Sequence, residues 1–269
     1  MKGVDFLADS YNSCKSEEFL KRCKPFEQLK GKYLLLYEKY ACLYEKLVEN
    51  IEDKACSRKY SKGGLTIHRG YYSPSFMDLV VSGCNRGHLL KKVPPSNKYD
   101  YEYIFNDKNQ LICVKKMQEP MKIASVELFV YESTRIVSLV YEGVLEYNLT
   151  TISECQYEND MISRYELALC GYDVDCNKAI CCEIDVEVPV YDDRYLHSIL
   201  WSRYMPSMHL LNQEKYTFSR DAKGMLSTYT VESIDGFNMN GDVSNGKRSY
   251  KVLSKNREDY NNYLLYKKR

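Results

Sequence analysis

The sequence predicts a mainly β, α+β fold: a long antiparallel hairpin meander forms a large twisted sheet, and a long N-terminal amphipathic helix packs on it. Three observations support this prediction. A short motif recurs along the chain, its flanks alternate apolar and polar side chains, and a helical pattern precedes it. The copies of the motif read VELFVYESTRIVSLVY (126–141), ISECQYENDMISRYEL (152–167) and VEVPVYDDRYLHSILW (186–201).

Each copy of the motif holds a tyrosine, an acid directly after it and an aliphatic residue five places beyond the tyrosine. In order, these are Tyr131, Glu132 and Ile136; Tyr157, Glu158 and Ile162; and Tyr191, Asp192 and Leu196. The flanking residues alternate with the period of a strand, and the β-branched and aromatic residues suit a pleated surface.

Short polar segments rich in Asp and Asn separate the alternating runs, as in 158–160, 192–193 and 106–109. Asp and Asn favour tight turns because they tolerate unusual backbone angles and hydrogen-bond their own main chain. Each unit is therefore expected to be a β-hairpin. A hairpin cannot bury its apolar face alone, so successive copies should pair edge to edge.

The N-terminal segment shows the apolar spacing of an amphipathic helix. The pattern turns helical from Ser16, and Pro25 then suits a new first turn, because its missing N–H has no partner there. Apolar residues recur after it from Phe26 to Ile51. We expect one helix of about 28 residues, roughly 40 Å long at 1.5 Å per residue. Packing on the sheet is the main interpretation, and a coiled-coil or partner surface is the alternative.

The region 57–98 reads as an irregular connection. A turn is expected at 61–64, followed by a short strand, and the run after Ser75 predicts a short helix capped by Ser73 or Ser75 and ending at Gly83. The chain should thus form one structural unit with an N-terminal helical segment (1–56), this connection, and a β-hairpin repeat domain (99–269).

The charge balance gives no overall field that would attract nucleic acid or an anionic membrane. Lys and Arg total 38, Asp and Glu total 37, and the net charge is +1. Asp5 and Asp9 interrupt the start of the chain, and no apolar run approaches the length of about 18 residues that a membrane span needs. We expect a cytoplasmic protein that binds neither nucleic acid nor membrane.

Cysteine usage points to reduced thiols rather than to a disulfide framework or a metal site. The chain holds 11 cysteines, an odd number. The densest group, Cys170, Cys176, Cys181 and Cys182, lacks the close cysteine pairs of zinc sites and contains no histidine. No cofactor motif is present, so no metal and no cofactor is expected.

The hairpin pattern resembles the YD (Rhs-type) repeat, whose units contain an aromatic strand, an Asp/Asn turn and an aliphatic return strand. The segments at 103–111 and 216–226 lie nearest to that pattern. A helical start followed by a run of such hairpins is similar to immunity proteins of bacterial toxin–antitoxin and related systems. The resemblance implies an immunity protein: a non-catalytic protein–protein interaction module that neutralises a cognate toxin by occluding it.

A protein partner, such as a toxin domain, would meet the repeated residues at the hairpin turns. The candidate contacts are Glu132, Glu158, Asp192, Asp193, Tyr131, Tyr157 and Tyr191. Two alternatives stay open. One is a cysteine-dependent enzyme in which Cys84 and His88, in a predicted loop, form a nucleophile–base pair. The other is a scaffold that self-assembles through an exposed sheet edge.

Overall fold

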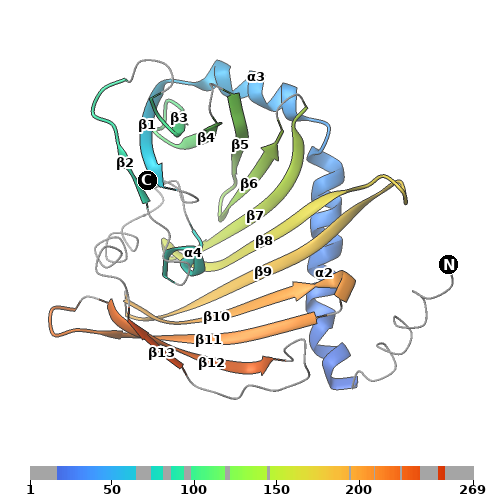
Figure 1. The fold of residues 1–269 in the computed structure, drawn as a ribbon, viewed down its shortest axis with the longest axis vertical. Helices are drawn as coiled ribbons and strands as arrows, with labels where there is room; N and C mark the ends of the chain where they lie inside the picture. The colour runs from blue at the N-terminus through green and yellow to red at the C-terminus, as the bar shows by residue number, and fades with distance from the viewer. Residues whose placement is uncertain are drawn as a thin grey trace.

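A computed structural model gives the fold of the chain (Figure 1). It describes residues 17–64, 74–80, 86–93, 98–118, 122–143, 146–193, 195–208, 210–224, 226–236 and 248–251. Within these ranges, 13 strands form a single antiparallel sheet. The predicted fold class, a mainly β hairpin meander with an N-terminal helix on it, is confirmed.

The helices are α2 (Glu17–Tyr40), α3 (Tyr44–Lys54), α4 (Phe76–Val80) and the 3-10 turn η1 (Pro206–Met208). The strands are β1 (Ser57–Gly64), β2 (Arg86–Leu89), β3 (Tyr101–Phe105), β4 (Leu111–Gln118), β5 (Lys122–Tyr131), β6 (Arg135–Glu142), β7 (Asn148–Glu158), β8 (Met161–Asp173), β9 (Lys178–Asp192), β10 (Tyr195–Met205), β11 (Leu210–Arg220), β12 (Leu226–Gly236) and β13 (Arg248–Lys251). From β3 to β13 each strand lies beside its neighbour in the chain, and β1 and then β2 extend the sheet beyond β3.

The region 57–98 is more regular than its sequence suggested. Residues 61–64, expected to be a turn, lie inside β1, and 86–89, expected to be a loop, form β2. Lys62 and Gly64 pair with β2, and this pairing overrides the local turn preference of the glycines. The strand expected just after Gly64 lies outside the described residues.

The predicted turn chemistry is present at the hairpin tips. Asn109, Asn159, Asp160, Asn177 and Asp193 all have positive φ angles, between 50° and 63°. Asn and Asp adopt this left-handed region at lower cost than other side chains with a Cβ. These residues therefore set where the chain reverses and which strands become neighbours.

The sheet is curved, with different covers on its two faces (Figure 1). Helices α2 and α3 run along the outer face, where their apolar stripe joins the largest core cluster, which includes Tyr33, Leu139 and Ile184. Helix α4 lies on the inner face, where Phe76 packs with Tyr165 and Trp201. Successive residues of a strand point to opposite faces, so β8 serves both clusters.

The single helix predicted for 26–53 is wrong in both its start and its continuity. Helix α2 begins before Pro25 and contains it, because Cys23 and Phe26 on either side are both buried in the core. A turn at 41–43 separates α2 from α3. The hydroxyl of Tyr141 donates to the Tyr40 carbonyl at 2.8 Å, so the sheet binds the chain where it must bend.

Two buried glutamates fasten α2 to the outer face. Glu154 of β7 and Glu166 of β8 face each other across the sheet, and Lys32 Nζ lies 3.0 Å from one carboxylate and 2.8 Å from the other. The hydroxyl of Tyr33 also donates to Glu166, at 2.9 Å. These bonds fix the rotation of α2 on the sheet, because Lys32 and Tyr33 are neighbours in the helix.

Candidate functional site

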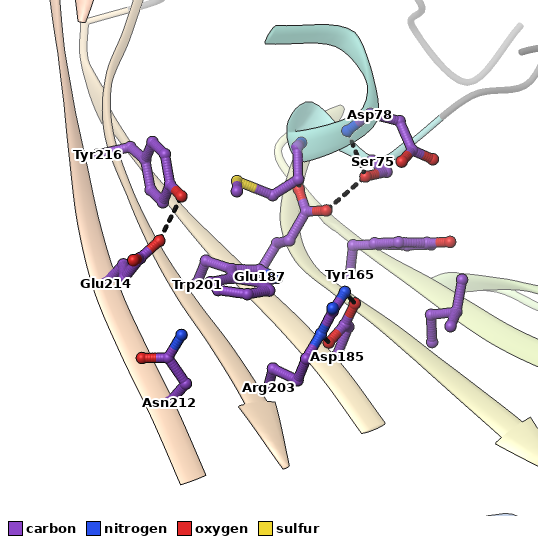
Figure 2. A pocket seen from close by; sticks show the side chains of 12 residues that line it. Ser75, Asp78, Tyr165, Asp185, Glu187, Trp201, Arg203, Asn212, Glu214 and Tyr216 are labelled. Carbon is purple, nitrogen blue, oxygen red and sulfur yellow. Dashed lines mark hydrogen bonds and ion pairs between the residues drawn. The ribbon is translucent and has the colours of Figure 1, made fainter. Parts of the chain in front are cut away.

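The inner face of the sheet contains a pocket of about 340 Å³ beneath α4 (Figure 2). Strands β8 to β11 form its floor and walls, and the first turn of α4 closes one side. Its lining residues are Ser75, Met77, Asp78, Tyr165, Leu167, Asp185, Glu187, Trp201, Arg203, Asn212, Glu214 and Tyr216.

Glu187 holds α4 over the pocket. Its carboxylate accepts hydrogen bonds from the Ser75 hydroxyl at 2.5 Å and from the Phe76 N–H at 2.7 Å, and Figure 2 shows it directed at the helix. Ser75 Oγ in turn accepts the Asp78 N–H at 3.1 Å, which makes Ser75 the N-cap, one of the two predicted. The predicted end of α4 at Gly83 lies outside the described residues.

Burial dominates the titration of Glu187. Only 2% of this residue is exposed, and desolvation raises the pKa of its carboxyl to about 8, although the hydrogen bonds from α4 favour the charged form. Both carboxylate oxygens are occupied by Ser75 and Phe76. Glu187 therefore anchors α4, and its carboxyl changes protonation state near neutral pH.

Arg203 forms the cationic part of the pocket floor. Its Nε and Nη2 donate to the two oxygens of Asp185 at 2.9 and 2.8 Å, and its Nε lies 3.2 Å from Glu183. The guanidinium carbon also lies 5.0 Å from the centre of the Trp201 ring. A planar guanidinium held by a two-pronged carboxylate contact and an aromatic face is rigidly placed.

The opposite wall comes from β11. The Tyr216 hydroxyl donates to Glu214, and this contact, with burial as the larger cause, raises the pKa of the phenol. Asp78 keeps surface open to solvent at the pocket, yet burial and then the nearby Asp185 raise the pKa of its carboxyl. Among the described residues, no ion pair joins a cation to Asp78 or Glu214.

The pocket thus has an excess of negative charge beside aromatic surface. Four carboxyl groups face one guanidinium. Even with Glu187 protonated, the charges of Asp78, Asp185 and Glu214 exceed that of Arg203. A group with several N–H or O–H donors, and above all a cation, fits this environment. The described residues contain no cluster of three or more His, Cys, Asp or Glu side chains arranged to hold a metal ion.

The predicted acidic contacts lie at the hairpin tips, away from the pocket. Glu132, Glu158, Asp192 and Asp193 are all exposed on one rim of the sheet, because alternate turns of a meander share an edge. Asp193 is six residues along the chain from Glu187, or about 20 Å of extended strand. The structure brings these acids into one row and does not bring them to the pocket.

The predicted tyrosine contacts serve the packing between hairpins. Tyr131 donates to the Leu111 carbonyl at 2.8 Å, and Tyr191 donates to the Ile162 carbonyl at 3.0 Å. Each bond joins the end of one hairpin to the start of a strand in the preceding hairpin. Tyr157 is surrounded by protein, and burial raises the pKa of its phenol well above the usual value. These contacts give the tyrosine of the motif a structural reason to recur, and its partner-binding role stays a prediction.

Of the proposed Cys84–His88 pair, the structure describes only His88. Cys84 lies outside the described residues. His88 is exposed in strand β2, not in a loop, with Lys62 as its cross-strand partner. The nucleophile–base pair therefore stays a hypothesis without geometry.

The sequence did contain one signal for the pocket. Glu183, Asp185 and Glu187 occur at every second position of a strand, which places three acids on one face. The only tryptophan, Trp201, lies in the next strand and is the cross-strand partner of Glu187. A strand with three acids on one face and an aromatic neighbour is a recognisable pattern for a polar site.

The comparisons with known proteins leave the function open. No family model matches the chain, and no curated protein matches it. A crystal structure of a protein of unknown function from Bacteroides fragilis NCTC 9343 is similar over 40% of this chain and 82% of its own, with 6% identity and a TM-score of 0.31. That likeness is too weak to carry an argument. No helix among the described residues is long and apolar enough to cross a membrane.

Proposed function

We propose that this protein is a non-catalytic protein-binding module whose inner-face pocket receives a basic side chain of a partner protein. The observation that carries the proposal is the charge of the pocket: no cation among the described residues forms an ion pair with Asp78 or Glu214, and Arg203, the cation in the lining, is held by Asp185. A lysine or arginine of a partner would supply the missing positive charge.

The apolar lining supports the same ligand class. Trp201, Tyr165 and Leu167 offer surface for the aliphatic stem of a long basic side chain, and carboxylates of the same lining can receive its charged end. Aromatic rings next to carboxylates also favour cations by cation–π attraction. A binding role fits better than acid–base catalysis. Glu187 has the most raised pKa of the pocket carboxyls, but both of its oxygens already accept hydrogen bonds from Ser75 and Phe76 at the start of α4.

The partner implied by the sequence resemblance is a bacterial toxin that this protein would neutralise by occlusion. A toxin whose active site uses a lysine or arginine would lose that residue to the pocket, and the row of exposed acids at the hairpin tips would add weaker contacts around it. Acidic surfaces of this kind speed association with basic partners and set orientation.

Trp201 makes the pocket directly testable, because it is the only tryptophan of the chain and lines the pocket. An arginine tripeptide titrated into the protein should change the fluorescence of Trp201 saturably, whereas a glutamate tripeptide should not. Asp78→Asn and Glu214→Gln should each weaken binding by roughly three- to tenfold, the worth of one charge-assisted hydrogen bond. The matched control Glu132→Gln, on the rim, should leave the affinity unchanged.

Equal binding of both tripeptides, or equal loss in the rim control, would show that the pocket does not select cations. For the natural partner, tagged wild-type protein and the Asp78→Asn/Glu214→Gln double variant should be used in parallel pull-downs. A toxic partner retained by the wild type and lost by the double variant is the expected result. A partner retained equally by both would place its contact elsewhere.

A further inference from the structure

Two buried cysteines face each other near the end of the β8–β9 hairpin. Cys170 of β8 and Cys181 of β9 are direct cross-strand partners, and they are only 7% and 5% exposed. Both belong to the core cluster under α2. The hairpin turn at 174–177 lies only a few residues away, so the pair sits at the base of an exposed tip.

The geometry of the pair suits a disulfide. Direct partners in an antiparallel sheet have Cα atoms about 4.5–5.5 Å apart, which lies inside the range of about 4.4–6.8 Å found for disulfides. The two thiols lie within hydrogen-bonding reach, since an interaction between them shifts the pKa of both, and Cys181 also donates to the Glu183 carbonyl at 3.8 Å.

The two sulfurs are electrostatically unequal. The hydrogen bond from Cys170, together with the nearby Lys30, lowers the pKa of the Cys181 thiol despite its burial. The same contact, followed by burial, raises the pKa of Cys170. A thiol with a lowered pKa beside one with a raised pKa is the arrangement of an attacking and a resolving thiol.

We propose that Cys170 and Cys181 form a redox-active dithiol that closes to an intramolecular disulfide by exchange with a small-molecule disulfide such as oxidised glutathione. The Cys181 thiolate attacks one sulfur of that disulfide, forms a mixed disulfide and expels one thiolate. The expelled thiolate takes the proton of Cys170. The Cys170 sulfur then attacks the sulfur of Cys181 and displaces the second small thiolate, so the dithiol is oxidised and the glutathione disulfide is reduced to two thiols.

The surroundings of the pair allow such exchange. Tyr172 and Val174 are 51% and 81% exposed, so little packing holds the end of the hairpin closed. Cys182, next to Cys181, is exposed at an irregularity in the β8–β9 register and offers a surface thiol through which exchange can start. Strand β9 then continues through Glu183 and Asp185, which hold Arg203 in the pocket.

The test treats the full-length reduced protein with glutathione redox buffers of increasing oxidised fraction, traps the remaining thiols with N-ethylmaleimide, and maps the cysteine-containing peptides by mass spectrometry. The expected product is a peptide pair linked through Cys170 and Cys181, formed reversibly and lost on adding reduced glutathione. Because the bond closes a short loop, oxidation should also raise Tm by about 5–10 °C.

Two variants separate the proposed chemistry from general thiol oxidation. Cys170→Ser should leave Cys181 as a stable glutathione mixed disulfide, since the resolving thiol is gone. The matched control Cys176→Ser removes an exposed cysteine of the same hairpin and should leave the Cys170–Cys181 product unchanged. The proposal is overturned if Cys170 and Cys181 in the wild type stay fully alkylated while Cys176 or Cys182 carries the glutathione, a result that needs no variant to fold.

Discussion

The outer and inner faces of the sheet both carry acids on neighbouring strands, but they differ in how those acids are balanced. On the outer face, Glu154 and Glu166 share three cations: Lys32, Arg135 and Arg164. On the inner face, the four carboxyl groups of the pocket have one guanidinium. The outer set is balanced by cations, whereas the inner set keeps an excess of negative charge.

The titration of one glutamate on each face reflects this difference. Burial raises the pKa of Glu166, but hydrogen bonds from Lys32 and Arg164 outweigh it, so the net shift is downward. Glu187 is equally buried and receives only uncharged donors, so its pKa rises to about 8. On the outer face, Lys32 pairs with the buried acids and fastens α2, whereas the inner face keeps an excess of negative charge at the pocket.

The largest expected effect follows from Glu187. Its folded-state pKa lies above its unfolded value, so the folded state binds the extra proton and stability falls as pH rises from about 4.5 to about 8. Glu187→Gln removes this titration. In urea unfolding, the free energy of unfolding of the variant should rise relative to that of the wild type by up to about 1.4 kcal/mol per pH unit within that window. Above the window the difference should stay constant. Parallel stability curves for the two proteins would contradict the burial of an ionisable Glu187.

The second effect tests the outer face. Lys32→Met leaves two buried carboxylates with less positive charge and should lower the free energy of unfolding by about 2–4 kcal/mol at neutral pH. Lys30→Met is the matched control, since Lys30 forms its ion pair with Glu27 at the helix surface and its loss should cost less than about 0.5 kcal/mol. Equal losses in the two variants would mean that Lys32 does not balance the buried acids.

A smaller effect is expected at the cap of α4. Ser75→Ala removes the hydroxyl that joins Glu187 to the Asp78 N–H and should cost about 1–2 kcal/mol. Binding of the arginine tripeptide should weaken as well, because Asp78 loses its fixed position. Ser75→Thr retains the hydroxyl and should recover most of the stability; a failure to recover it would point to a steric limit at the cap rather than to the hydrogen bond.

The smallest effect separates the two kinds of motif residue. Tyr131→Phe removes the hydroxyl that donates to Leu111 and should cost about 1 kcal/mol in urea unfolding. Glu132→Gln, one residue further on, removes an exposed charge beside Arg135 and should change stability by less than about 0.5 kcal/mol. A larger loss of stability for Glu132→Gln than for Tyr131→Phe would assign the structural role to the acid and favour the tyrosine as the partner contact.

The sheet was predictable because its signals are local. Alternation in strands such as β5 and the Asp and Asn residues at the turns specify hairpins, and hairpins in series specify a meander. The break between α2 and α3 was not predictable, because it depends on Tyr141, about 100 residues away. The pocket was visible in part: the alternating acids of β9 mark a polar face, but the contact of Glu187 with Ser75 could not be predicted, because 112 positions separate the two residues.

The order of the elements along the chain has a consequence for synthesis on the ribosome. Helix α2 is made first, but the strands on which it docks, β7 to β9, are made more than 100 residues later. Each new hairpin can pair with the one before it, since its partners are close in sequence. The apolar stripe of α2 stays exposed to water until strands β7 to β9, on which it packs, have been made. That interval makes the nascent N-terminal segment the natural target for chaperones that hold exposed apolar helices.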